Sequence, residues 1–170
     1  MDALAAWITR INDWIFRLVS WLCLALVLVY FASTAARYLF SYSDAALQES
    51  ALYLHALIFL GAAAACVARD QHVRVDIFYA RWSAGRRAAV NLFGSLCLLL
   101  PFAAFLLWIS WDYVARAWAI REASMDPGGL PLVYLLKSLI LFAAAQLMLQ
   151  AIAQAIRALA TLRRAPPDPA

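Results

Sequence analysis

Long apolar segments alternate with short charged stretches along this chain of 170 residues. Two uncharged runs cover residues 18–36 and 88–111, and two more apolar segments cover residues 49–68 and 131–156. An α-helix rises about 1.5 Å per residue, so roughly 20 residues cross the ~30 Å hydrocarbon core of a bilayer. The pattern therefore predicts an all-α integral membrane protein whose four transmembrane helices coincide with these segments.

Two stretches outside these segments also carry apolar side chains at helical spacing. Before residue 18 the apolar positions are Leu4, Trp7, Ile8, Ile11, Trp14 and Ile15, and before the third segment they are Val75, Phe78, Tyr79 and Trp82. This spacing predicts short amphipathic helices in the membrane interface, at the N-terminus and between spans 2 and 3. Candidate interfacial anchors are Trp14, Arg74, Asp76, Trp82 and Lys137. The ammonium of Lys137 is expected to snorkel back to the headgroups.

The composition supports a membrane location and indicates an orientation. The chain is 66% hydrophobic and 14% charged, whereas soluble domains average about 45–50% and about 25%. Ten arginines gather near the two termini and between spans 2 and 3. Cytoplasmic loops are rich in Arg and Lys, so both termini are predicted to be cytoplasmic. The net charge of +4 then reflects topology and contact with anionic lipid, not nucleic-acid binding.

The length favours one membrane domain over residues 1–158, followed by a cytoplasmic tail, residues 159–170, that is expected to be disordered. The first apolar run could instead be a cleavable signal peptide, but its length and the acids and tryptophans before it favour a retained anchor. Pro101 lacks an amide hydrogen and predicts a kink in the third span. Asp112 and Arg116 are four residues apart and are predicted to pair.

Five residues are candidates for contact with a partner subunit: Glu49, Tyr53, Gly61, Gln146 and Gln150. A carboxylate such as Glu49 is favourable at a helix N-terminus, and it could equally contact a partner. Gly61 permits close approach of a helix from this chain or from another. The glutamines share one helix face with Gln154, so they either pack inside the bundle or meet a partner.

Catalytic chemistry is hard to place on this sequence. Cys23, Cys66 and Cys97 lie in separate apolar runs, which favours apolar packing over a disulfide. His55 has no second intramembrane histidine to share a haem, so a hydrogen-bonded packing role is expected. No metal-ligand, phosphate-binding or nucleophile motif stands out, so we expect a non-catalytic chain without catalytic, cofactor or metal residues. A transporter working alone would carry ionisable or broken-helix features near the midplane. An accessory or scaffold subunit is therefore favoured.

Degenerate motifs from about Trp14 to Arg157 carry a family resemblance. They are Arg37 with the short loop after it, Glu49, Gly61-Ala62-Ala63, His72-Val73-Arg74-Val75-Asp76, and Leu130-Pro131 with Tyr134 and Lys137. In these features the sequence resembles the small membrane subunit, DctQ type, of tripartite ATP-independent periplasmic (TRAP) transporters. The most specific of the motifs is the turn from His72 to Asp76, after a glycine-bearing second span.

The resemblance implies a multi-pass protein of the bacterial inner membrane that works in sodium-driven uptake of an organic acid or similar solute. Its expected partners are the lipid bilayer, a periplasmic substrate-binding protein and a large elevator-type membrane subunit, whose scaffold it braces and which would hold the sodium ions. Candidate contacts with the binding protein are Arg37, Asp44, Glu122 and Asp126.

Two other classes of protein remain open on the sequence alone. A self-contained small four-helix exporter or channel would transport a solute without any partner. A membrane anchor of a redox complex would bind haem or quinone, although the single intramembrane histidine counts against it.

Overall fold

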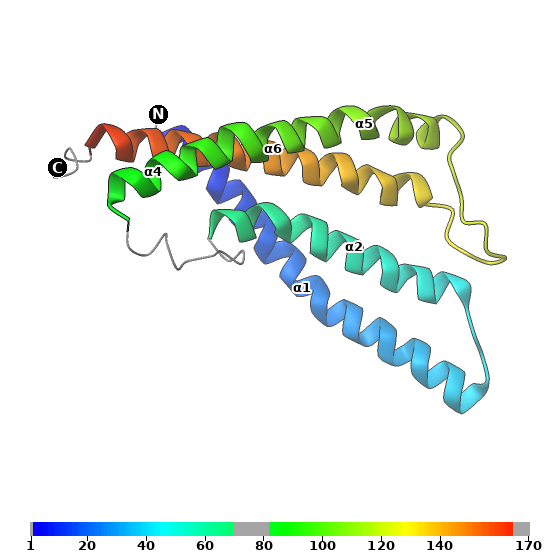
Figure 1. The fold of residues 1–170 in the computed structure, drawn as a ribbon. Coiled ribbons are helices and arrows are strands. Elements are labelled where there is room, and N and C mark those ends of the chain that lie inside the picture. The colour runs from blue at the N-terminus through cyan, green and yellow to red at the C-terminus, as the bar shows by residue number, and fades with distance from the viewer. Residues whose placement is uncertain (1, 70–81, 165–170) are drawn as a thin grey trace.

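The computed structural model describes residues 2–69 and 82–164, and every long element in them is helical. Helix α1 (Asp2–Phe40) is followed by α2 (Ala45–Ala68). Helix α4 (Ala84–Phe93), the π-helical segment η1 (Gly94–Leu99) and α5 (Leu100–Ala119) then run on without a break, and α6 (Val133–Arg164) closes the fold (Figure 1). Among the described residues, four helices are long and apolar enough to cross a membrane. This confirms the predicted all-α class and gives four candidate spans.

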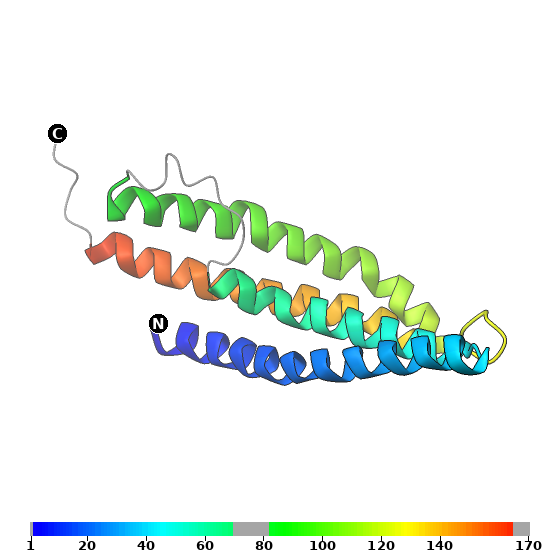
Figure 2. The same cartoon turned by 90° about the horizontal axis from the view of Figure 1, so that it is seen from below.

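Helix α6 is the centre of the arrangement, because it packs against α1, α2, α4, η1 and α5. Its buried positions are mostly alanines, which bring the neighbouring helix backbones close: Ala143, Ala144, Ala151, Ala153, Ala155 and Ala158. Helices α1 and α2 form an antiparallel hairpin on one side, and α5 lies along α6 on the other (Figures 1 and 2). Towards its C-terminal end α1 diverges from α5 and α6 and keeps α2 as its neighbour (Figure 1).

The N-terminal stretch differs from its prediction. Helix α1 is one uninterrupted helix of 39 residues, so the expected interfacial helix before residue 18 is the first part of the spanning helix. Neither Gly nor Pro occurs in it to break the helix. Its apolar face does not lie on lipid alone, since Ala5 and Ile8 are buried in a cluster with Ala153 of α6. Trp7 and Trp14 occupy the outward face and are more than half exposed.

The second predicted interfacial helix falls almost entirely outside the described residues, and so do Arg74, Asp76 and the turn that begins at His72. Residues 165–170 of the predicted tail also lie outside them. The predicted anchor Trp82 is described and lies immediately before Ser83. The hydroxyl of Ser83 accepts a hydrogen bond from the amide of Arg86 at 3.3 Å and thereby caps α4.

Pro101 changes the helix in a more specific way than the predicted kink. The six residues before α5 form the π-helical segment η1, in which the amide of Leu100 bonds to the carbonyl of Ser95, five residues back. A proline cannot donate to the carbonyl four residues before it, and its ring crowds that carbonyl. A wider π-turn before Pro101 relieves this conflict without ending the helix.

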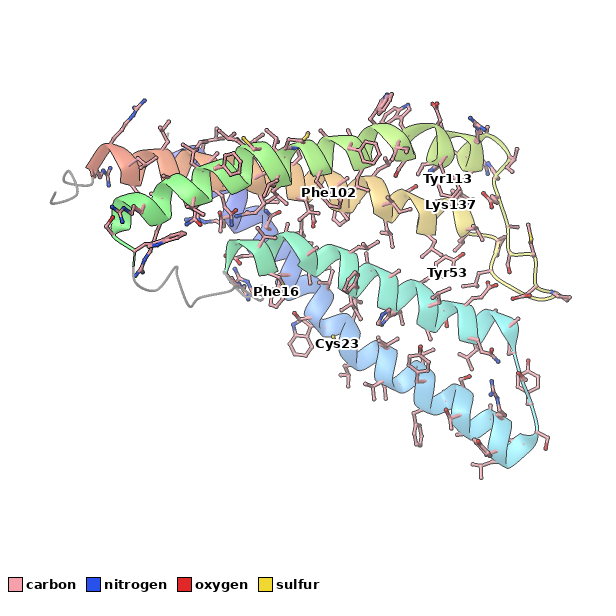
Figure 3. The ribbon with its side chains drawn as sticks, in the orientation of Figure 1. Phe16, Cys23, Tyr53, Phe102, Tyr113 and Lys137 are labelled. Atoms are coloured by element: carbon pink, nitrogen blue, oxygen red, sulfur yellow. The ribbon has the colours of Figure 1, made fainter. Side chains whose placement is uncertain are left out.

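Both termini lie at the same end of the molecule, as an even number of spans requires (Figures 1 and 2). At this end Arg69 forms an ion pair with Asp13 of α1, with 2.9 Å between Nη2 and Oδ1. Its guanidinium also lies 4.2 Å from the ring centre of Phe16, which Figure 3 labels. The assignment of this end to the cytoplasm remains the prediction made from the arginines.

Candidate functional site

The glutamines of α6 form a polar ladder, here meaning Gln146, Gln150 and Gln154, that faces the other helices. Gln150 is fully buried, and its Oε1 accepts a hydrogen bond from Nδ2 of Asn12 at 2.9 Å. Gln154 donates from Nε2 to the carbonyl of Val67 at 2.9 Å and accepts from the hydroxyl of Ser95 at 3.3 Å. The ladder therefore ties α1, α2 and η1 to α6.

The placement of the glutamines favours the first of their two predicted roles. Gln146 is 5% exposed and Gln150 0%, so both side chains pack inside the bundle of this chain. Both amide atoms of Gln146 lack a hydrogen-bond partner in the described chain. Leaving a buried polar group unpaired costs roughly 1–3 kcal/mol. Gln146 therefore does not add a hydrogen bond to the stability of the ladder within the described chain.

Asn12 is the member of this network that the sequence interpretation missed, because the N-terminal stretch was interpreted as an interfacial helix whose buried face is made by the apolar positions alone. Its side chain is 1% exposed. Positions 5, 8 and 12 follow helical spacing, and Ala5 and Ile8 are both buried. A polar residue in register with a buried apolar stripe was the signal that could have placed it.

At the opposite end of the molecule, Glu49 holds the loop between α5 and α6. Its carboxylate accepts hydrogen bonds from the hydroxyl of Ser124 and from the amide of Leu130, the latter at 2.6 Å. Gly129 makes this approach possible, since a Cβ there would lie 2.7 Å from Oε1 of Glu49. The sequence left two roles open for Glu49, a favourable charge at a helix terminus or a contact with a partner. The structure shows a third, in which its carboxylate holds the α5–α6 loop; we call this set of contacts the Glu49 clamp.

Tyr53 lies one turn beyond Glu49, on the side of α2 that faces α6 (Figure 3). Its hydroxyl is buried and has no hydrogen-bond partner among the described residues.

Lys137 and Glu122 form a second internal contact at this end. The ammonium of Lys137 lies 2.5 and 2.7 Å from the two carboxylate oxygens of Glu122, and 4.2 Å from the ring centre of Tyr113 (Figure 3). The side chain leans towards the start of α6, where a carboxylate of the same chain binds its ammonium. Its predicted contact with the headgroups stays a prediction.

Aromatic residues close the same corner between α5 and α6. Trp118 donates from Nε1 to the hydroxyl of Ser138 at 2.7 Å, and its ring meets Tyr134 edge to face at 4.8 Å. Together with the Lys137 contact this fixes the start of α6 against the end of α5.

Asp44 and Gly61 serve the α1–α2 hairpin. Asp44 caps α2 by accepting from the amide of Leu47 at 3.2 Å, and it also accepts from the hydroxyl of Tyr42 at 2.8 Å. The Tyr42 hydrogen bond, assisted by the Leu47 amide, lowers the pKa of Asp44 below its usual value. At Gly61 a Cβ would lie 2.9 Å from Cγ1 of Val19, so the close neighbour of this glycine is α1 of the same chain.

One further prediction is wrong, and another stays a prediction. His55 is exposed on α2 and makes no hydrogen bond to any described residue, so this chain does not supply the packing partner that was expected for it. Asp112 and Arg116 are both exposed, and the ion pairs between described residues are Asp13–Arg69 and Glu122–Lys137. Four-residue spacing alone did not bring that pair together.

The remaining candidates lie on the surface of the loop end. Arg37 is exposed in the last turn of α1. Asp126 is exposed in the α5–α6 loop beside Met125, which is 98% exposed. Cys23, Cys66 and Cys97 are free thiols, and no group of three or more metal-ligating side chains occurs among the described residues.

These features define a multi-pass α-helical membrane protein whose polar side chains hold its own helices and loops together. The family model for the DctQ component of tripartite ATP-independent periplasmic transporters matches residues 26–161. The chain therefore belongs to the DctQ family and is the small membrane component of a TRAP transporter. No curated protein and no solved structure matches it.

Family membership confirms the resemblance seen in the sequence. The DctQ family is a transporter component, generally non-catalytic, that works with a large membrane subunit and a periplasmic binding protein. The matched region includes the Glu49 clamp and the polar ladder, whereas Asn12 lies before it.

Proposed function

We propose that this chain braces the scaffold of the large, elevator-type subunit of a sodium-driven TRAP transporter. The transporter takes up an organic acid or similar solute across the bacterial inner membrane, and both termini of this chain are cytoplasmic. Sodium binds in the large subunit, and this chain holds no cofactor. The internal ties made by Glu49, Lys137 and the polar ladder support the proposal, since they stiffen the chain.

The observation that carries the proposal is the outer face of α2, defined here by Leu52, His55 and Phe59. All three side chains are exposed, and their spacing puts them on one side of the helix. Ionisable residues within spans are rare and almost always face protein or water, because lipid does not solvate them. His55 lies near the middle of α2. This face is therefore the proposed contact with the large subunit.

This assignment moves the proposed contact away from the residues that the sequence suggested. Glu49, Gly61, Gln146 and Gln150 all have close neighbours within the chain. They act on assembly indirectly, by holding α2 in place. Tyr53, on the inner side of α2, belongs with them.

The α2 contact can be tested with His55→Leu. If lipid covers this face, leucine is at least as favourable as histidine, and assembly is unchanged. If the large subunit covers it, a hydrogen bond between helices is lost, which costs about 1 kcal/mol or roughly fivefold in affinity. The measurement is the amount of large subunit that co-purifies in mild detergent. Trp108→Leu, an exposed position on α5, is the matched control. An equal yield from both variants rejects the α2 contact.

Reconstitution tests the function itself. Sealed vesicles that contain the large subunit, this chain and the binding protein should accumulate solute when a sodium gradient is applied, and vesicles without this chain should not. Vesicles with this chain alone should stay inactive. Uptake by this chain alone would make it a self-contained transporter, and a haem or quinone absorption band would make it a redox anchor; family membership favours neither.

Docking of the binding protein is proposed at the α5–α6 loop, with the exposed carboxylate of Asp126 as the main contact. Asp44 and Glu122 already accept hydrogen bonds within the chain. Reversing the charge with Asp126→Lys should lower capture of the binding protein by membranes that contain both transporter subunits. An unchanged capture would remove Asp126 from the docking surface.

A further inference from the structure

A groove of about 400 Å³ lies between the C-terminal end of α1 and the N-terminal end of α2. We call it the α1–α2 groove. Its lining includes Ser33, Thr34 and Arg37 of α1 and Gln48 of α2, together with the aromatic residues Tyr30 and Tyr38. It lies at the loop end of the molecule, away from both termini (Figure 1). None of the contacts described above uses it.

The charge in the groove is positive and unbalanced. Arg37 is the one formally charged residue of the lining, and it forms no ion pair with any described residue. The two nearest carboxylates in sequence are already in use: Asp44 accepts from Tyr42 and Leu47, and Glu49 accepts from Ser124 and Leu130. The groove therefore suits an anionic group.

The hydroxyls of the groove are also without partners in the described chain. Four helical hydroxyls bond back to a carbonyl four residues earlier, at Thr9, Ser20, Ser138 and Thr161. Ser33 and Thr34, like Ser110 of α5, make no such bond to the described chain. They line the groove as unused donors beside the Arg37 guanidinium.

The depth of the groove decides what can occupy it. Ser33 and Thr34 belong to the uncharged run that ends at Ala36, so they lie at the edge of the hydrocarbon core, with Arg37 at headgroup level. A soluble protein that docks on the loops would meet Arg37 but would not reach Ser33. Further into the membrane, on the same side of α1, the exposed apolar residues Val27 and Leu24 continue the line of the groove.

We propose that the α1–α2 groove binds one phospholipid of the leaflet away from the termini, through its phosphate group. The Arg37 guanidinium donates to the phosphate oxygens. The hydroxyls of Ser33 and Thr34 donate to the phosphate or to the ester oxygens below it, and one acyl chain lies along Val27 and Leu24. The bound lipid fills the space between the two helices at the end where α2 is the neighbour of α1 among the described residues (Figure 1).

The test uses the full chain, purified in mild detergent, stripped of lipid and supplied with dioleoylphosphatidylglycerol. Native mass spectrometry should show one retained lipid per chain, and a diazirine derivative of the same lipid should label peptides from residues 30–51. Dioleoylglycerol, which lacks the phosphate, should be retained much less. Arg37→Gln should lower retention of the phospholipid roughly tenfold, because a charge-assisted hydrogen bond is lost.

Arg116→Gln is the matched control, since it removes one exposed arginine at the same end of the molecule and should retain lipid like the unchanged chain. Thr34→Val keeps the side-chain shape and should lower retention about threefold, so the proposal stays testable if Arg37→Gln does not fold.

Three results would overturn the proposal. The first is equal retention of dioleoylglycerol, and the second is displacement of the lipid by millimolar inorganic phosphate. The third is unchanged lipid retention in Arg37→Gln combined with weaker capture of the binding protein, which would make Arg37 a docking contact. None of these results depends on assembly with the large subunit, so the brace function is tested separately.

Discussion

The two ends of the molecule are held together by different means. At the end with the termini, α1, α2 and η1 are all bonded to α6, through the Asn12 side chain to Gln150, and through the Val67 carbonyl and the Ser95 hydroxyl to Gln154. At the loop end the α1–α2 hairpin is tied to the rest by the Glu49 carboxylate, which holds the α5–α6 loop. At the end with the termini, hydrogen bonds join helix to helix. At the loop end, the α1–α2 hairpin is held by the contact of Glu49 with the α5–α6 loop.

This difference teaches how a small subunit can be rigid and still present a large surface. The bonded end fixes the directions of all four spans. The loop end can then leave most of α1 and the outer face of α2 open to lipid or to another protein (Figure 1). A bundle bonded equally along its whole length would bury that surface against itself.

The largest expected effect comes from forcing the two helices of the hairpin apart with Gly61→Leu. A Cβ added at Gly61 would lie 2.9 Å from Cγ1 of Val19. Overpacking of this kind typically costs 1–3 kcal/mol, so we expect a loss of about 3 kcal/mol in the free energy of unfolding in detergent. Gly94→Leu is the control, because no atom lies within 4 Å of a Cβ there. Equal losses in the two variants would show that the approach of α1 to α2 is not what the glycine provides.

Opening the loop contact with Glu49→Ala should cost about 2 kcal/mol, because two hydrogen bonds to a carboxylate are lost. The Leu130 amide should exchange with deuterium faster, while the amides of α6 near Gln150 stay protected. Asp112→Asn, an exposed carboxylate at the same end, should leave both regions unchanged. Faster exchange at Gln150 in the Glu49 variant would contradict the independence of the two ends.

The bond between α1 and α6 should contribute less. In a double-mutant cycle with Asn12→Leu and Gln150→Leu we expect a coupling of about 0.6–1 kcal/mol, the range typical of hydrogen bonds between membrane helices. The single variants should lose stability, since each leaves one buried amide unpaired, and the double variant should recover part of it. A coupling near zero would mean that burial of the amides, not their bond, holds α1 in place.

The smallest effect is a dependence on pH at the start of α2. The folded pKa of Asp44 lies below its ordinary value of 3.8, chiefly because Tyr42 donates a hydrogen bond to the carboxylate. Its contribution is therefore fully present above about pH 4 and is lost as the pH falls below the lowered pKa. Protection of the Leu47 amide should decline in acid, and it should stay constant in Asp44→Asn, whose side chain caps without titrating. A flat profile in the unchanged chain would refute this.

The spans were predictable because lipid offers the backbone no hydrogen-bond partners, so long apolar runs must be helical. The role of Gln150 was also predictable, since a stripe of glutamines is costly in lipid. The contacts between distant residues were not: Glu49 meets Leu130, and Lys137 meets Glu122, only because the loop turns at Arg121 and Gly128, both at positive φ. A one-dimensional pattern contains no such information.

His55 shows the opposite limit of sequence reasoning. Rules for buried polar groups led to a hydrogen-bonded packing role, yet the side chain lies on the open side of α2. Helical spacing fixes which residues share a face, but not whether a neighbour from the same chain covers that face. For a subunit of a larger assembly, the exposed polar residue is therefore the more informative one.

The length of α1 has a consequence for the surrounding bilayer. A helix of 39 residues measures about 58 Å, nearly twice the ~30 Å of hydrocarbon that it crosses. We expect α1 to lean in the bilayer, which would keep the exposed indoles of Trp7 and Trp14 among the headgroups. The Asn12–Gln150 hydrogen bond joins α6 to this tilted helix. The cross-section of the protein in one leaflet would then be displaced sideways from its cross-section in the other, so that lipids of the two leaflets contact differently shaped protein surfaces.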